Sequence, residues 1–71
     1  MKLGSKIRII RLLKNISAKE MATLLNMSQG NYDKIEREEI DVSEENLAIL
    51  AKEFGVTVDV IKKFRKEHFF S

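Results

Sequence analysis

Apolar residues recur along the chain three or four positions apart, which is the spacing of helices that bury one face. Leu3, Ile7 and Ile10 predict a first helix over about residues 3–14. The sequence has no proline, and its apolar and polar residues do not alternate as they do in strands. We therefore expect an all-α fold.

Serine residues mark where the next two helices begin, because their side chains cap free backbone N–H groups. Ser17 and Glu20 form a capping box that starts a second helix. The apolar stripe of this helix consists of Met21, Ala22 and Leu25. Ser28 is the expected N-cap of a third helix, whose inward side chains are Tyr32 and Ile35.

Two further helices follow. Ser43, with two glutamates after it, starts the fourth helix, and Gly55 ends it in the left-handed conformation. Its inward residues are Leu47, Leu50, Ala51 and Phe54. Thr57 caps a last helix over about residues 58–70. The five helices predict a compact bundle that forms a single domain over residues 1–71.

Residues 17–37 combine two short helices and a tight turn, which is the layout of a helix-turn-helix. Helices that cross steeply need a small residue at their contact, and Ala22 supplies it. Asn26 tolerates the positive φ that the turn requires, and Tyr32 wedges the third helix onto the second. In DNA-binding proteins with this layout, the second helix of the pair enters the major groove.

The sequence resembles the lambda-repressor-like, Cro/Xre-type helix-turn-helix family over about Leu3 to Ile61. The matching motifs are Gly4-x2-Ile7-x3-Arg11, Ile16-Ser17, Met21-Ala22, Met27-Ser28-Gln29, Ile35-Glu36-Arg37 and Leu47-x2-Leu50-Ala51-x2-Phe54-Gly55-Val56. The resemblance implies that the third helix lies in the major groove and that the domain acts as a transcriptional regulator. It also implies that Arg11 and Glu36 pair across the first and third helices. A direct contact of Arg11 with DNA is the alternative.

The third helix has a polar face that is the candidate DNA-reading surface. If Tyr32 and Ile35 face the core, helical geometry turns outward Gln29, Gly30, Asp33, Lys34 and Arg37, with Asn31 at the margin. Gln29 matches the base-reading glutamine of the family, and its amide can bond an adenine edge. Lys34 can donate to guanine, and Arg37 to guanine or a phosphate. The alternative is an ordinary solvated face.

The remaining residues of this face have less specific roles. Gly30 lets the backbone come close to DNA, and Asp33 either accepts from cytosine or repels phosphates. We also place Ser17, Lys19 and Ser28 among the DNA-binding residues, because helix N-termini attract phosphates. Lys19 is equally well interpreted as an ordinary exposed lysine.

Three features depart from the family pattern. Ala18 stands where relatives usually have a glutamine that braces phosphate, and Asn26 replaces the usual turn glycine. Glu38, Glu39 and Asp41 fill the loop after the third helix, where relatives often place glycine and polar residues. These carboxylates oppose DNA unless they point away or cap the fourth helix, a role open to Asp41 or Ser43. We therefore expect weakened DNA binding.

The C-terminal helix carries apolar residues beyond what the bundle clearly needs. The candidates for a two-fold interface are Val60, Phe64, Phe69 and Phe70. An equally weighted alternative is that Phe64 and Phe69 fold back onto the first helix near Ile9 and Leu13.

Composition argues against several other kinds of site. Without cysteine the chain has no disulfide or thiolate metal site, and a single histidine, His68, cannot build a metal site alone. No apolar run is long enough to span a bilayer and no secretory signal is visible, so we expect a cytoplasmic protein without membrane contact. We expect no cofactor and no enzymatic activity, because no nucleophile constellation is present. The net charge of +2 is compatible with a polyanionic ligand but does not imply one.

The sequence thus predicts sequence-specific binding of double-stranded DNA by a transcriptional regulator, a repressor or an autoregulator, working as a homodimer on two half-sites. The alternative is a protein-interaction module of the same fold, such as an antitoxin-like binder of a protein partner with weak DNA affinity. The acidic loop and the apolar tail favour that alternative.

Overall fold

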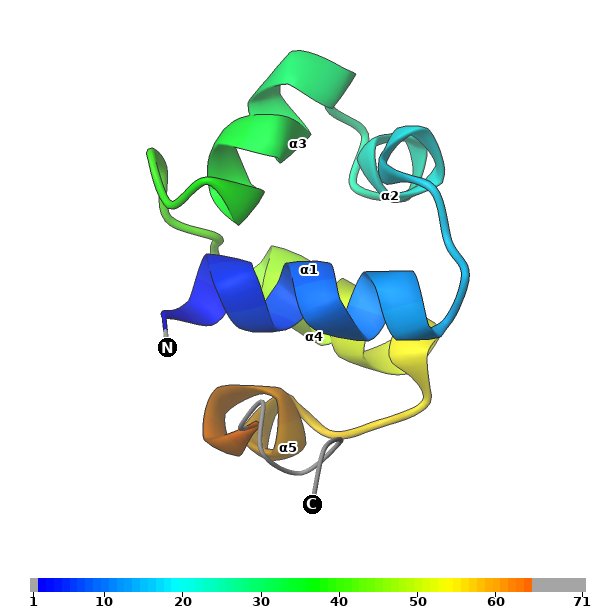
Figure 1. Cartoon of the computed structure of the whole chain (residues 1–71), viewed down its shortest axis with the longest axis vertical. Coiled ribbons are helices and arrows are strands. Elements are labelled where there is room, and N and C mark those ends of the chain that lie inside the picture. Colours follow the sequence, from blue (N-terminus) through cyan, green and yellow to red (C-terminus); the bar gives the residue numbers. More distant parts are fainter. Residues whose placement is uncertain (1, 65–71) are drawn as a thin grey trace.

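The computed structural model describes residues 2–64, and these form five helices and no strand (Figure 1). The helices are α1 (Leu3–Leu13), α2 (Ala18–Leu24), α3 (Gln29–Glu36), α4 (Glu44–Phe54) and α5 (Val58–Lys63). The expectation of an all-α, lambda-repressor-like bundle is confirmed.

Hydroxyl side chains begin four of the five helices, as predicted. Each accepts a hydrogen bond from the backbone N–H three residues later, at 3.0–3.1 Å. The capping residues are Ser17, Ser28, Ser43 and Thr57. Such a bond satisfies one of the N–H groups that the first turn of a helix leaves without a partner.

The first four helices end on a residue in the left-handed conformation. These residues are Asn15, Asn26, Glu38 and Gly55, with φ between 56° and 72°. In each case the next residue donates its N–H to a carbonyl five residues back, which is the Schellman arrangement. The positive φ predicted for Asn26 and the left-handed end predicted at Gly55 are confirmed, whereas Asn15 and Glu38 were not anticipated.

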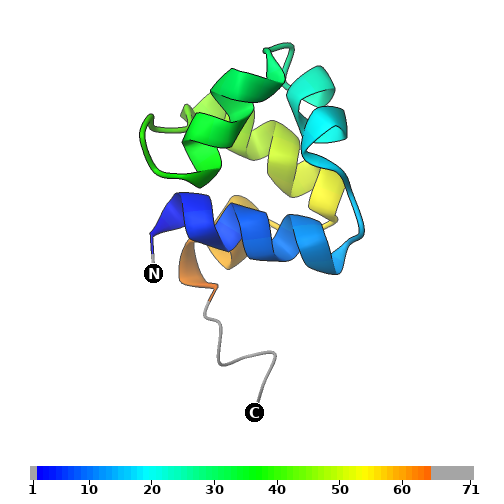
Figure 2. The ribbon, with the colours of Figure 1, turned by 45° about the horizontal axis from the view of Figure 1, so that its top comes forward.

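One core receives side chains from every helix. Ile7 of α1, Met21 of α2, Tyr32 of α3, Leu50 of α4 and Ile61 of α5 are all fully buried. Figures 1 and 2 show α2 and α3 on one side of α1 and α5 on the other. Because α1 packs against both α3 and α5, it is the element that positions the helix-turn-helix on the rest of the fold.

The last helix is shorter than predicted. It ends at Lys63, and Phe64 leaves the helical conformation with φ −57° and ψ 136°. Lys6 of α1 donates to the carbonyl of Lys62, and the Phe64 side chain enters the core, so the chain turns inward here. Phe64 is therefore buried, which agrees with the alternative that it folds back onto the bundle and not with an exposed two-fold interface. Phe69 and Phe70 lie outside the described residues.

Candidate nucleic-acid interface

The turn between α2 and α3 is built as its sequence predicts. Asn26 adopts a φ of 56°, and Met27 donates its N–H to the carbonyl of Ala22 at 3.0 Å. Ala22 and Tyr32 are both buried where the two helices pack together. The turn therefore sets α3 across α2 in the arrangement of a helix-turn-helix.

The third helix has one buried and one exposed face. Tyr32, Ile35 and Glu36 are buried. The predicted reading residues on the other side are exposed, namely Gln29, Gly30, Asn31, Lys34 and Arg37, while Asp33 is half-buried. Ser17, Lys19 and Ser28 are exposed as well. The side chains predicted to meet DNA are thus accessible, which is a condition for contact, and their individual roles stay predictions.

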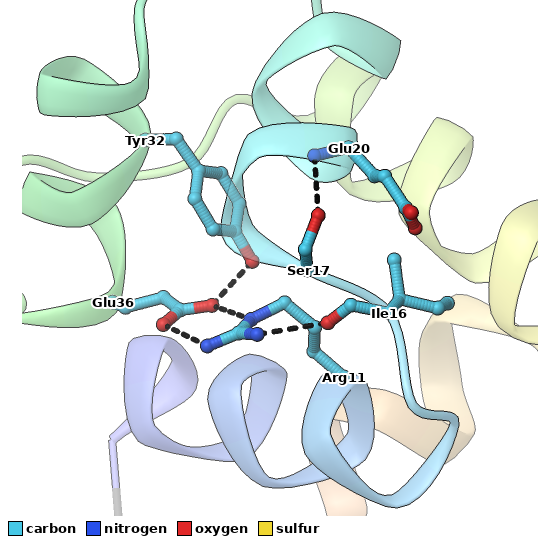
Figure 3. Close-up of polar contacts among 6 residues, drawn as sticks. All are labelled: Arg11, Ile16, Ser17, Glu20, Tyr32 and Glu36. Carbon is cyan, nitrogen blue, oxygen red and sulfur yellow. Dashed lines mark hydrogen bonds and ion pairs between the residues drawn. The ribbon is translucent and has the colours of Figure 1, made fainter.

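A buried polar network holds α3 from behind (Figure 3). Arg11 Nε donates to Glu36 Oε2 at 2.7 Å, and Arg11 Nη2 donates to Glu36 Oε1 at 3.1 Å. Arg11 Nη1 donates to the carbonyl of Ile16, just before α2, at 2.8 Å. The Tyr32 hydroxyl donates to the same Glu36 carboxylate. One guanidinium therefore connects α1, the entry to α2 and the buried side of α3.

Two side chains of this network, Tyr32 and Arg11, have shifted pKa values. Burial raises the pKa of the Tyr32 phenol above its ordinary value, and the hydrogen bond to Glu36 raises it further. The hydrogen bond to Glu36 also raises the pKa of Arg11. A neutral phenol and a charged guanidinium hence share one carboxylate. The resemblance implied the Arg11–Glu36 pair, but the hydrogen bond from Tyr32 to Glu36 was not predicted. Their spacing of four residues within one helix could have indicated it, because side chains at this spacing are neighbours.

The three carboxylates of the acidic loop after α3 have different surroundings. Glu38 Oε1 accepts from the backbone N–H of Ser5 at 3.2 Å and from its hydroxyl at 2.9 Å. Glu39 accepts from Arg37 Nε at 2.5 Å, and this hydrogen bond raises the pKa of Arg37. Asp41 is exposed. Asp41 and Ser43 were the two residues suggested as caps of the fourth helix, and Ser43 is the one that caps it. The acidic residue of this loop that caps a helix is Glu38, and the helix that it caps is α1.

Two further observations on residues 2–64 concern metal ions and membranes. No three histidine, cysteine or acidic side chains there are placed to hold a metal ion. None of the helices in that range is both long and apolar enough to cross a membrane.

Comparison with known families agrees with this geometry. Residues 7–61 match the family described as Helix-turn-helix. A comparison with curated proteins gives no match. The matched range begins within α1 and extends into α5, so it contains both helices of the motif and the core that supports them. The chain therefore belongs to the lambda-repressor-like, Cro/Xre-type helix-turn-helix family of DNA-binding domains.

Proposed function

We propose that this protein is a sequence-specific transcriptional regulator, a repressor or an autoregulator, that reads the major groove of double-stranded DNA with α3. The observation that carries the proposal is the division of α3 into two faces. Its polar residues Gln29 and Lys34 are exposed, while Tyr32, Ile35 and Glu36 anchor the opposite side. A short helix that is rigidly held and displays amide and cationic groups suits the hydrogen-bonding pattern of base edges.

Each residue of the exposed surface has a proposed role. Gln29 bonds an adenine edge, and Lys34 and Arg37 donate to guanine or to phosphate. Gly30, Asn31 and Asp33 complete the surface that faces the bases. Ser17, Lys19 and Ser28 contact phosphates at the starts of α2 and α3, where N–H groups of the first turn point outward.

A homodimer on two half-sites is part of this proposal, because a single domain of this size makes few base contacts. Half-sites about 34 Å apart correspond to one turn of the double helix. With Phe64 in the core, Val60 is the remaining interface candidate among residues 2–64, and 49 % of it is exposed. A chromosomal target also implies action in the compartment that holds the DNA, so the cytoplasmic location stays within the proposal.

The test begins with selection of bound sequences from a random DNA pool, which reports both the preferred site and its symmetry. On the selected site, Gln29→Ala is expected to relax base preference by about 1–3 kcal/mol, because it removes a base contact. Lys19→Ala is expected to weaken binding to all sequences alike and to lower the salt dependence. If both variants lose the same affinity on every sequence, the reading role of Gln29 is wrong.

A second function is favoured by the apolar surface. Leu12 and Leu13 at the end of α1 are each 54 % exposed, which suits contact with a protein partner. In that case the same fold holds a partner, as an antitoxin does, and binds DNA weakly. Binding that stays undetectable at about 50 mM salt, where phosphate contacts are strong, would reject the regulator and leave this alternative.

A further inference from the structure

The first helix lacks a cap of its own. Its N-cap residue, Lys2, makes no side-chain hydrogen bond to the helix, and no acidic residue lies in its first turn. The other four helices each begin with a serine or threonine that accepts a backbone N–H. The first turn of α1 therefore has no side-chain acceptor from its own N-cap residue.

Glu38 supplies that acceptor from 33 residues away. One carboxylate oxygen takes both the backbone N–H and the hydroxyl of Ser5, at 3.2 and 2.9 Å. At the same time the backbone of Glu38 ends α3 with a φ of 66°. A glutamate adopts this left-handed conformation at a conformational cost that glycine does not incur. The same residue thus terminates α3 and caps α1.

The two helices also meet backbone to backbone at this point. A Cβ added to Gly4 would lie 2.2 Å from the carbonyl oxygen of Ile35 and 2.9 Å from Cγ of Glu38. An open hollow of about 530 Å³ borders this contact, and its lining includes Ile40 and Val42. Side chains do not fill this hollow, so beside the close contact at Gly4 the hydrogen bonds of Glu38 connect the end of α3 to α1.

The contact with Ser5 complements the ion pair at Arg11. Ser5 and Arg11 lie six residues apart on α1, which is about 9 Å along the helix axis. Two anchors separated along α1 constrain the angle of α3 more than one anchor does, in addition to the packing of Tyr32 and Ile35 in the core. Ser5 lies before residue 7, where the family match begins, so the α1 side of this second anchor is outside the matched range.

We propose that Glu38 is a positioning residue for DNA recognition, which locks the recognition helix α3 onto α1 through Ser5. This inference rests on the proposed function for its DNA readout. The change in DNA affinity that it predicts for loss of Glu38 is opposite to the change that simple electrostatics predicts. A carboxylate beside the DNA-reading helix repels phosphates, so its removal should strengthen binding. If Glu38 holds α3 in place, its removal weakens binding instead.

Three variants separate positioning from charge and from stability. Glu38→Gln removes the charge but keeps an oxygen that accepts from Ser5. Glu38→Gly removes the acceptor and also relieves the left-handed backbone, so the lost cap is offset in stability. Glu39→Gln is the matched control, because Glu39 carries the same charge one residue later and bonds Arg37 rather than α1.

The first measurement is affinity for the selected DNA site, by fluorescence anisotropy, with the folded fraction checked by urea unfolding. Glu38→Gly is expected to lose about tenfold in affinity, comparable to one misplaced base contact. Glu38→Gln is expected to stay within about threefold of wild type, and Glu39→Gln to bind as tightly or more tightly, because it frees Arg37 and removes a repelling charge. A folded Glu38→Gly variant that binds as tightly as wild type overturns the proposal. An equal loss in Glu38→Gln would also overturn it, because the glutamine oxygen can still accept from Ser5.

The second measurement needs no DNA. In amide NMR spectra, Glu38→Gly is expected to shift the resonances along the whole of α3, Gln29–Glu36, while Glu38→Gln leaves α3 close to wild type. Shifts in Glu38→Gly that stay confined to the first turn of α1 and the loop overturn the positioning role. If wild type selects no DNA sequence, the proposed function fails, and the spectra still decide whether Glu38 positions α3.

Discussion

Replacement of Arg11 by methionine tests whether the buried ion pair serves stability or position. The change keeps an apolar stem but removes the guanidinium that binds both oxygens of Glu36, at 2.7 and 3.1 Å. Glu36 is only 8 % exposed, so its charge would stay buried with the Tyr32 hydroxyl as its remaining partner. Breaking a buried pair in this way costs about 3–5 kcal/mol.

That loss is large for a domain of this size. A chain of 71 residues has a total free energy of unfolding of roughly 4–10 kcal/mol at the usual 0.05–0.15 kcal/mol per residue. Arg11→Met should therefore remove at least about a third of the stability, and all of it at the low end of that range. Glu36→Leu should have a similar effect, because it leaves the guanidinium buried with only the carbonyl of Ile16 to bind.

The double variant Arg11→Met/Glu36→Leu gives the decisive comparison. It buries no charge, and its main loss is the acceptor of the Tyr32 hydroxyl, which costs about 1–3 kcal/mol. We expect it to be more stable than either single variant in urea unfolding followed by circular dichroism. We also expect it to lose DNA affinity although it folds, because α3 has lost its polar anchor. A double variant less stable than both single variants would refute the energetic reasoning, and wild-type DNA affinity would refute the positional role.

Two further predictions concern the packing of α3. Gly4→Ala should destabilise the fold by about 1–3 kcal/mol, because the new Cβ would meet the carbonyl oxygen of Ile35 at 2.2 Å. Gly30→Ala is the control with open space around its Cβ, and it should raise the free energy of unfolding by about 0.5–1 kcal/mol; equal effects at both positions would contradict this packing. Tyr32 is the only tyrosine and there is no tryptophan, so phenolate absorbance reports this residue alone. Because its pKa is raised, the stability that it contributes is full below about pH 10 and is lost above it, so phenolate should form together with unfolding, and phenolate formed in a folded domain would contradict the buried network.

Local signals in the sequence were enough to predict most of the helices. Ser17, Ser28, Ser43 and Thr57 each act on an N–H three residues away, so the cap and its target lie in one short stretch. The left-handed turn at Asn26 is likewise a property of one residue type at one position. The outward face of α3 followed from helical geometry once Tyr32 and Ile35 were assigned to the core.

The features that sequence reasoning missed depend on contacts between distant residues. Glu38 has a left-handed backbone and caps a helix that begins 35 residues earlier, and neither fact leaves a local pattern in the sequence. From the sequence alone, the three carboxylates after α3 were expected to repel DNA, to point away from it or to cap the fourth helix, and a contact with α1 was not considered. The end of α5 was misplaced for the same reason, because burial of Phe64 in the shared core outweighs the helical pattern that continues through the tail.

If α3 reads DNA as proposed, recognition also depends on residues that do not face DNA. The recognition helix has eight residues, which is too few for a stable helix in isolation. Its conformation and its angle must therefore come from its ends and its buried side, and these are held by Ser5 and Arg11 of α1. If Gln29 contacts one base as proposed, its replacement should alter preference at one position of the site. A change at Ser5 or Arg11 is expected to displace the whole helix and to lower discrimination at every position that α3 reads. The salt dependence of DNA affinity should stay as in wild type, because the proposed phosphate contact of Lys19 is kept. Selection profiles of such variants that differ from wild type at a single base pair would show that α3 is held by other contacts.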